Sequence, residues 1–285
     1  MAPWRCAGSR GDGLIRSVRG HACVYDRIGY GPDLVLLHSV GLSTREGWRF
    51  QMPLLSQHFT VLSYDFRGLG QSERGAEPLG VDTFVRDLED LLRQLGIARP
   101  ALMGVSLGGF VAQEFAIRNP DAVSSLVLVS TTGRIFEGHA ERRAARNAAI
   151  RKGGMAAAAD HQLDSHFPAG FASAHPEVMA WYRAHYLAND PANYIDIMDD
   201  LGRFDSRDRL SAIRCPTLIV AGGDDASSVA GRAPLDSARA LHRLIAGSEL
   251  AVIDGAFHYP QIDHPEAFNE RALAFLIRTA PARAR

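Results

Sequence analysis

The sequence predicts an α/β fold in which a mainly parallel central sheet is flanked by helices and carries an inserted helical cap. First, short apolar runs alternate with segments of helical character, and such alternation is typical of parallel sheets. Second, the alternation stops between about residues 133 and 210 and then resumes. Third, 285 residues with 46% hydrophobic content can bury a large core.

Continuous apolar runs followed by polar or turn-forming residues favour strands that are buried on both faces. After an edge hairpin of 14–18 and 22–28, the expected strands are 34–37, 60–64, 101–105, 126–129, 217–220 and 250–253. The expected helices of the core are 45–57, 81–95, 107–118, 234–244 and 265–278. Asn119-Pro120 ends the third of these helices. A proline begins each of the last two, where the first turn needs no N–H donor.

This pattern divides the chain into a core of residues 14–132 and 211–280 and a helical cap of residues 133–210. The cap segment is inserted between two expected strands, contains alanine-rich and histidine-containing stretches, and has no convincing strand of its own. The end segments, 1–13 and 281–285, are expected to be flexible.

Composition and charge limit the classes of partner. The formal net charge of −1 gives no overall attraction for nucleic acid or an anionic membrane. No apolar stretch has the length of a membrane span, and the first residues lack the apolar segment of a secretory signal. We therefore expect a cytoplasmic protein with neither nucleic-acid nor membrane partners. The oligomeric state is left open, with a homodimer as one alternative.

The three cysteines are interpreted as packing residues. Cys6, Cys23 and Cys215 are odd in number and widely spaced, which suits a reducing compartment and matches no zinc-ligand spacing. No metal site is expected.

The stretch ALMGVSLGGF, residues 101–110, places Ser106 between an expected buried strand and an expected helix. Its G-x-S-x-G spacing is that of a nucleophile elbow, in which glycines two residues to either side permit a tight, strained turn. The turn holds the hydroxyl out at the top of the sheet, and the amino end of the next helix directs partial positive charge there. Ser106 is therefore the candidate nucleophile, and the N–H of Leu107 is a candidate oxyanion donor.

A serine nucleophile needs a base, and the base needs a carboxylate that fixes its tautomer. In this strand-turn-helix context the chain order is serine, acid, histidine. The stretch TLIVAGGDD places Asp224 and Asp225 directly after an expected strand, and His258 follows the last expected strand. A second oxyanion donor is expected from the loop LLHSVGLS, where Val40 lies shortly after a strand.

Residues 14 to 280 resemble the α/β-hydrolase superfamily, through LLHSVG, DFRGLGQS, GVSLGG, GGDD and the ending GAFH…HPEAF. Within the superfamily the chain is similar to 3-oxoadipate enol-lactonases and related cofactor-free esterases. This similarity rests on Ser39-Val40-Gly41, on Trp48 with Gln51, and on stretches such as RNAAIRKGGMAAAAD and HFPAGFASAHPE. His38 departs from the lactonases, where asparagine is frequent at this place. The loop DFRGLGQS is interpreted as scaffold.

The resemblance implies a serine hydrolase that cleaves a small ester or lactone through an acyl-serine intermediate, without metal or organic cofactor. It also implies that the acid is Asp225, three residues after Gly222, so that Ser106, Asp225 and His258 form the triad. Candidate substrate contacts are His38, Trp48 and Trp181, with a packing or structural role as the alternative for each.

The sequence leaves two questions open. The basic run that includes Arg142, Arg143 and Arg146 is interpreted either as a solvated helix face or as an electropositive entrance for an anionic substrate. The function also has alternatives: a cofactorless oxygenase, perhydrolase or other non-hydrolytic natural-product enzyme on the same fold, or a ligand receptor that retains a triad.

Overall fold

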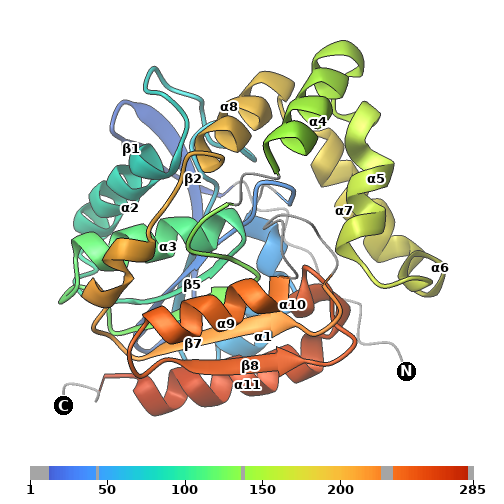
Figure 1. The fold of residues 1–285 in the computed structure, drawn as a ribbon. Coiled ribbons are helices and arrows are strands. Elements are labelled where there is room, and N and C mark those ends of the chain that lie inside the picture. Colours follow the sequence, from blue (N-terminus) through green and yellow to red (C-terminus); the bar gives the residue numbers. More distant parts are fainter. Residues whose placement is uncertain (1–12, 43–44, 136–138, 226–233, 282–285) are drawn as a thin grey trace.

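The computed structural model describes residues 13–42, 45–135, 139–225 and 234–281. Within these ranges, eight strands form one sheet in the order β1-β2-β4-β3-β5-β6-β7-β8 (Figure 1). The strands are β1 (Leu14–Val18), β2 (His21–Ile28), β3 (Asp33–Leu37), β4 (Thr60–Tyr64), β5 (Ala101–Val105), β6 (Ser125–Val129), β7 (Thr217–Gly222) and β8 (Glu249–Ile253). Strand β2 runs antiparallel to both β1 and β4, and the other described pairings are parallel. The predicted mainly parallel sheet is confirmed.

Helices cover both faces of this sheet. They are η1 (Arg45–Trp48), α1 (Met52–Leu55), α2 (Val81–Leu95), α3 (Leu107–Arg118), α4 (His139–Gly153), α5 (Ala156–His166), α6 (Phe171–Ala174), α7 (Pro176–Leu187), α8 (Pro191–Leu201), η2 (Arg207–Ala212), α9 (Pro234–Leu244), α10 (Pro260–Asp263) and α11 (Pro265–Thr279). α2, α3, η2 and α9 pack side by side. Figure 1 shows α9 and α11 on opposite sides of β7 and β8.

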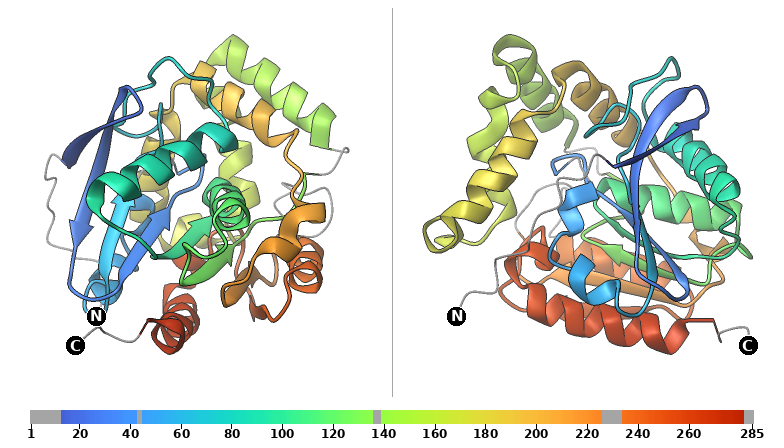
Figure 2. Two further views of the ribbon diagram at one scale, coloured as in Figure 1. Left: turned by 90° about the vertical axis from the view of Figure 1, so that its left-hand side faces the viewer. Right: turned by 180° about the vertical axis from the view of Figure 1, so that it is seen from behind.

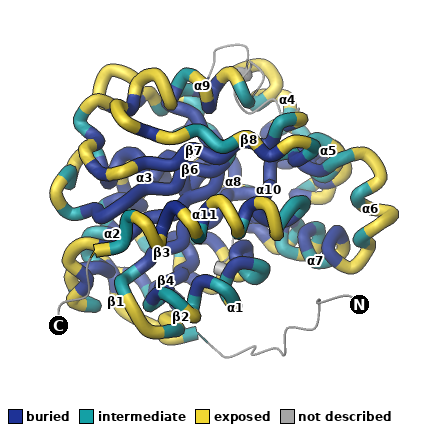
Figure 3. Tube along the Cα trace, turned by 90° about the horizontal axis from the view of Figure 1, so that it is seen from below, coloured by how far each residue is buried: buried dark blue, intermediate teal, exposed yellow. Residues whose placement is uncertain are grey.

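Local sequence explains the central elements. Every residue of β5 and β6 is buried, as their uninterrupted apolar runs predict. Helix α2 buries a stripe that includes Phe84, Leu88 and Leu91, and it ends at Gly96, whose φ of 68° is the left-handed conformation that favours glycine at a helix end. Figure 3 shows central strands such as β3, β6 and β7 in the buried interior of the molecule.

Helices α4 to α8 lie between β6 and β7 in the chain, and Figure 1 shows α4 to α7 standing away from the sheet. Helix α8 joins this group to the core, because Asn193 Nδ2 donates to the Gly68 carbonyl at 2.9 Å and Asp200 accepts from the Val81 N–H at 2.9 Å. The exposed β1–β2 hairpin lies at the sheet edge remote from the cap helices α5 and α6 (Figure 2). The division into core and cap at residues 133 and 210 stays a prediction.

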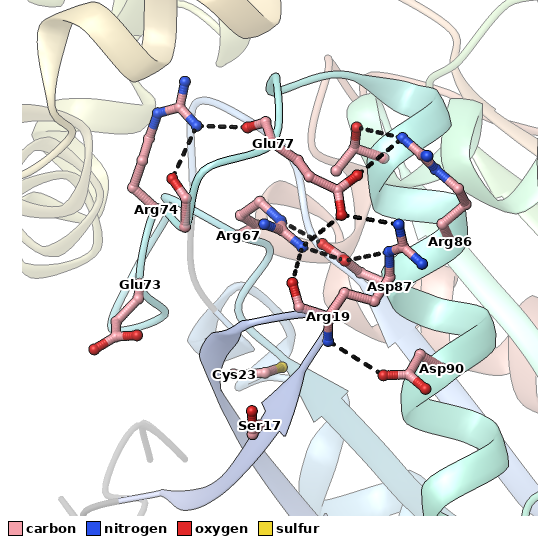
Figure 4. A network of polar contacts seen from close by, with 12 residues as sticks. Ser17, Arg19, Cys23, Arg67, Glu73, Arg74, Glu77, Arg86, Asp87 and Asp90 are labelled. Carbon is pink, nitrogen blue, oxygen red and sulfur yellow. Dashed lines mark hydrogen bonds and ion pairs between the residues drawn. The ribbon is translucent and has the colours of Figure 1, made fainter.

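The loop DFRGLGQS is held by a buried ion-pair network (Figure 4). Arg67 donates from Nε and Nη2 to the two carboxylate oxygens of Asp87 on α2, at 2.8 and 2.7 Å. Arg19 and Arg86 add ion pairs to Glu77 on the rim of this pair. Removing one partner of a buried pair typically costs about 3–5 kcal/mol, so this network strongly fixes the loop that follows β4.

Two sequence expectations differ from the structure or fall outside it. The helix expected over 45–57 is divided into η1 and α1, because Pro53 stands in the first turn of α1 and has no N–H with which to continue a preceding helix. Cys6 and most of the end segments expected to be flexible, residues 1–12 and 282–285, lie outside the described residues. Among the described residues, no helix is long and apolar enough to cross a membrane.

Candidate active site

Ser106 lies at the carboxyl end of β5, where the chain turns directly into α3. Its φ of 51° is in the left-handed region, which a serine adopts at a cost of about 1–3 kcal/mol. The Ser106 N–H donates to the Val129 carbonyl at 2.9 Å, which fixes the turn against the neighbouring strand β6. Such strain is retained only where the surrounding structure enforces it, so the turn has the geometry expected of an elbow.

The two flanking glycines are required by close backbone contacts. A Cβ at position 104 would lie 2.2 Å from the Gly108 carbonyl oxygen, and a Cβ at position 108 would lie 2.2 Å from the Leu37 carbonyl oxygen. Both distances are far below van der Waals contact. The elbow therefore packs α3 against the ends of both β3 and β5.

The loop after β3 begins beside the elbow, because Leu37 and Gly104 are paired residues of adjacent parallel strands. The carboxyl ends of β3 and β5 therefore bring Val40 and Leu107 to one edge of the sheet. Leu107 is the first residue of α3, where backbone N–H groups have no acceptor within the helix. These two N–H groups stay the predicted oxyanion donors.

His38 holds the same loop in place. Its Nδ1 lies 2.8 Å from the Ser39 carbonyl oxygen, and its Nε2 accepts from the Phe66 N–H at 2.9 Å. The side chain is buried, and both ring nitrogens are bonded to the backbone. The sequence left His38 as either a substrate contact or a structural residue. These bonds support the structural role, between the loops after β3 and β4, and a substrate contact stays a prediction.

Asp225 and His258 meet beyond the ends of β7 and β8. The Nδ1 of His258 lies 3.1 Å from Oδ2 of Asp225, and both side chains are buried. Asp224, the other aspartate that the sequence offered, is exposed. A buried carboxylate on Nδ1 fixes the tautomer in which Nε2 is free to accept a proton.

The histidine loop has a second acidic anchor that the sequence analysis missed. Asp263 accepts from the Phe257 N–H at 2.7 Å and contacts Nδ1 of His264 at 3.0 Å. Burial raises the pKa of this carboxyl to about 6, although the two hydrogen bonds oppose the shift. The stretch HYPQIDHPEAF contains this aspartate, but its backbone partner is not evident from spacing.

The two tryptophans proposed as substrate contacts lie in packing positions. Trp48 is fully buried, and its ring lies 6.2 Å from that of Phe268 on α11. This burial favours the packing role that the sequence left open for Trp48, and a substrate contact stays a prediction. Trp181 is partly buried on α7, with its ring 6.1 Å from Phe50 and 5.0 Å from the Arg49 guanidinium. A substrate contact by Trp181 stays a prediction.

A cavity of about 480 Å³ lies inside the cap, between α4, α5 and α8. Its polar lining includes three arginines, Arg142, Arg143 and Arg146, as well as His161 and His166. Among the described residues no acidic side chain lines it, and Arg143 pairs with Asp199 at 3.3 Å. His166 also stacks on His258, with ring centroids 4.5 Å apart. The cavity is therefore separated from the candidate base by one imidazole ring. Neither the cavity nor His166 was predicted from the sequence.

Comparison with known proteins defines the class. The sequence profile of the α/β-hydrolase fold family matches residues 32–265, so the chain belongs to that family. It is 30% identical to a putative carbamate hydrolase RutD of Agrobacterium fabrum over 257 residues, which cover 86% of this chain and 93% of that protein.

Two lactonases are among the similar proteins. The chain is 28% identical to 3-oxoadipate enol-lactonase 2 of Acinetobacter baylyi over 248 residues, 87% of this chain and 89% of that protein. It superposes on the crystal structure of the enol-lactonase from Burkholderia xenovorans with a TM-score of 0.85, 29% identity, and coverage of 93% and 100%. The resemblance that the sequence motifs indicated is confirmed, and the chain is a hydrolase by family. Within the described residues, no group of three histidine, cysteine or acidic side chains is placed to hold a metal ion.

The adjacent aspartates provide a matched test of the triad. Asp225→Asn should lower turnover of an activated ester by about 10⁴-fold, because the amide stabilises the wrong tautomer of the histidine. Asp224→Asn changes an exposed side chain and should leave turnover near the wild-type value. Steady-state kinetics of both variants distinguish them, and a large loss in Asp224→Asn alone would reverse the assignment.

Proposed function

We propose that this protein is a cofactor-free serine hydrolase that cleaves an ester or lactone through an acyl-serine intermediate. The observation that carries the proposal is the buried contact of 3.1 Å between His258 and Asp225. These residues follow β8 and β7, which belong to the same sheet as β5, the strand that ends at the strained Ser106 turn. Family membership and the lactonase relatives support the same chemistry.

The proposed mechanism follows from the roles of these groups. Ser106 Oγ attacks the carbonyl carbon while Nε2 of His258 takes its proton, and Asp225 stabilises the imidazolium that forms. The N–H groups of Val40 and Leu107 bind the oxyanion, and each such donor typically contributes about 2.7–4 kcal/mol to the transition state. His258 then protonates the leaving group. It next activates a water molecule that releases the acyl group and regenerates Ser106.

Other acyl substrates require the same groups. One relative is named as a putative carbamate hydrolase, and a carbamate carbonyl is attacked in the same way as an ester. A non-hydrolytic enzyme on this fold and a receptor that retains its triad would also keep these side chains. Turnover of a small activated ester separates the receptor from the enzyme.

Ser106→Ala tests the proposal directly. The substitution should abolish hydrolysis of p-nitrophenyl acetate, with a fall of about 10⁴- to 10⁶-fold in kcat, because the loss of a triad member removes the covalent route. Circular dichroism should remain unchanged, since alanine is smaller than serine and fits the same turn. Turnover of the alanine variant at the wild-type rate would contradict the serine mechanism.

We further propose that the preferred substrate carries a carboxylate. The support comes from the cavity inside the cap, which three arginines line without an acidic neighbour in the lining. Of these three arginines, Arg146 carries the argument. Its guanidinium lies over the Tyr194 ring at 5.5 Å, and its Nε and Nη2 have no hydrogen-bond partner among the described residues. Stacking on a ring uses the face of the guanidinium and leaves its edge donors for a planar anion.

The contacts of Arg146 lead toward the triad from two sides. The positive charge of Arg146 acts on His166, which stacks on His258. Tyr194, beneath Arg146, contacts Tyr186 with ring centroids 5.8 Å apart. Tyr186 in turn approaches Gly41, the residue after Val40. These contacts connect Arg146 with the histidine loop and with the loop that carries Val40.

A half-ester and its neutral analogue test this preference. The kcat/KM for the p-nitrophenyl half-ester of adipic acid should exceed that for its methyl ester. The advantage should fall as salt rises, because exposed charges are screened over about 8–10 Å at 0.1–0.15 M salt. Arg146→Met should raise KM for the half-ester by about tenfold or more, as expected for a lost charged hydrogen bond.

Arg151→Met is the matched control for Arg146→Met. Arg151 lies on the same helix, is exposed and does not line the cavity. Arg151→Met should leave the preference for the half-ester over its methyl ester unchanged. Equal kcat/KM for the two esters at every salt concentration would contradict an anionic substrate.

The proposal includes a cytoplasmic location and a small-molecule partner. Cys23 and Cys215 are free and buried, which suits a reducing compartment. A homodimer remains an open alternative for the oligomeric state.

A further inference from the structure

A cap residue covers the candidate base. His166 is the last residue of α5, and its ring stacks on that of His258 with an angle of 27° between the planes. The backbone N–H of His258 also donates to the His166 carbonyl at 3.2 Å. Both residues are buried. The cap therefore contacts the histidine loop through a ring face and through the backbone at the same place.

A chain of hydrogen bonds continues from His166 to the loop after β3. Nδ1 of His166 lies 3.1 Å from the Tyr182 hydroxyl on α7, which donates to the Tyr259 hydroxyl at 3.5 Å. The Tyr259 hydroxyl lies 2.9 Å from Ser39 Oγ, which accepts from the Leu42 N–H at 3.0 Å. We call His166, Tyr182, Tyr259 and Ser39 the relay. It joins the cap, the residue after His258 and the loop that carries Val40.

The tight packing of that loop supports the relay. A Cβ at position 41 would lie 3.0 Å from both the Tyr182 and the Tyr259 hydroxyl oxygens. Glycine at this position allows the backbone next to Val40 to approach the two phenols. The loop is thereby held by the side chains of the cap and of the histidine loop together.

The relay has a consistent direction only when His166 is neutral. Gln162 Nε2 lies 2.6 Å from Nε2 and 3.3 Å from Nδ1 of His166. With the shorter contact as the hydrogen bond, Nε2 accepts and the proton is on Nδ1. Nδ1–H then donates to Tyr182, whose own proton goes to Tyr259. A second proton on the ring would sit on Nε2, where this N–H donor would face the N–H donor of Gln162.

The surroundings of His166 keep it uncharged. Burial holds the pKa of His166 well below its ordinary value, and the guanidinium of Arg146 lowers that pKa further. The phenols of Tyr182 and Tyr259, which face the ring from α7 and the histidine loop, have raised pKa values because they are buried. No carboxylate is among these neighbours to stabilise a protonated ring.

We propose that His166 and Tyr182 are positioning residues that couple the docking of the cap to the placement of both His258 and the Val40 loop. The inference rests on the proposed hydrolase function. Stacking restricts rotation of the His258 ring, and the relay fixes the turn that presents the Val40 N–H. Both groups act only when they are oriented, and a misplacement of about 1 Å can cost about 100-fold in rate. The cap thus acts on the chemistry as well as on substrate access.

Tyr182→Phe is the sharpest test, because it interrupts the relay, keeps the ring and does not touch His258. We expect the rate at which a fluorophosphonate labels Ser106, and kcat for p-nitrophenyl acetate, to fall by about tenfold or more, with KM changed less than twofold. His166→Phe keeps a stacked ring but removes its hydrogen bonds, and it should give a similar loss. Tyr64→Phe removes a buried hydroxyl without a hydrogen-bond partner from β4 and should change nothing.

A pH measurement separates positioning from packing. Because the pKa of His166 is lower in the folded protein, only the unfolded chain takes up a proton here as pH falls below the ordinary histidine value of about 6.5. Native stability at this site is therefore complete at high pH and is lost as pH falls. The fall in Tm from pH 8 to pH 5 should be smaller in His166→Phe than in the wild type. An identical fall in both proteins would contradict a neutral, bonded His166.

Tyr182→Phe with wild-type labelling rate and kcat would overturn the proposal. Failure of the hydrolase function itself looks different, since the wild type would then be neither labelled nor active on esters. In that case ¹⁵N NMR of the histidine rings tests whether the cap residues still affect the placement of His258. Tyr182→Phe must still shift the His258 ring signals. Unchanged signals would overturn the proposed coupling between the cap and His258.

Discussion

The close approach of α3 to the ends of β3 and β5 is the constraint on which the rest of the site depends. Backbone atoms meet where the Cβ atoms of positions 104 and 108 would otherwise stand, so the turn between them has no alternative path. Ser106 adopts a positive φ as a result, and its hydroxyl is held at the edge of the sheet. The same contact fixes Leu37 and thereby the start of the Val40 loop. One packing constraint thus determines the place of the candidate nucleophile and of both expected oxyanion donors.

The base and its acid are positioned by a separate mechanism. Their loops extend from β7 and β8, which pair through Gly222 and Ile253, and backbone hydrogen bonds from Gly223 and Asp224 hold the two loops together. Burial of His258 and Asp225 strengthens the attraction between an imidazolium and a carboxylate, because little water screens it. The cap then covers the outer side of the histidine with His166. Core and cap together therefore define the environment of the base.

The sequence predicted the strands well, because their signals are local. The candidate triad stays a prediction, and of its members the structure shows His258 and Asp225 in contact. Ser106 is recognisable from two glycines within five residues, and His258 follows an apolar run. The relay could not be predicted, since His166 and Tyr182 belong to the cap and meet Tyr259 and Ser39 only in the folded chain. The role of Trp48 was left open for a related reason: a tryptophan near a catalytic motif has the same local pattern whether it faces a pocket or the core. Pro53 was a local signal that a continuous helix over 45–57 would be interrupted. The helical spacing of the apolar residues was given more weight than this signal.

The central claim is that Ser106 carries the acyl group during turnover, and mass spectrometry of the acid-quenched protein tests it most directly. After reaction with p-nitrophenyl acetate, the account predicts that the mass of one acetyl group is found on the peptide that contains Ser106 and is absent from Ser106→Ala. Substrate turnover accompanied by an acetyl group on a different residue, or by no adduct in a quench during the pre-steady-state burst, would contradict it.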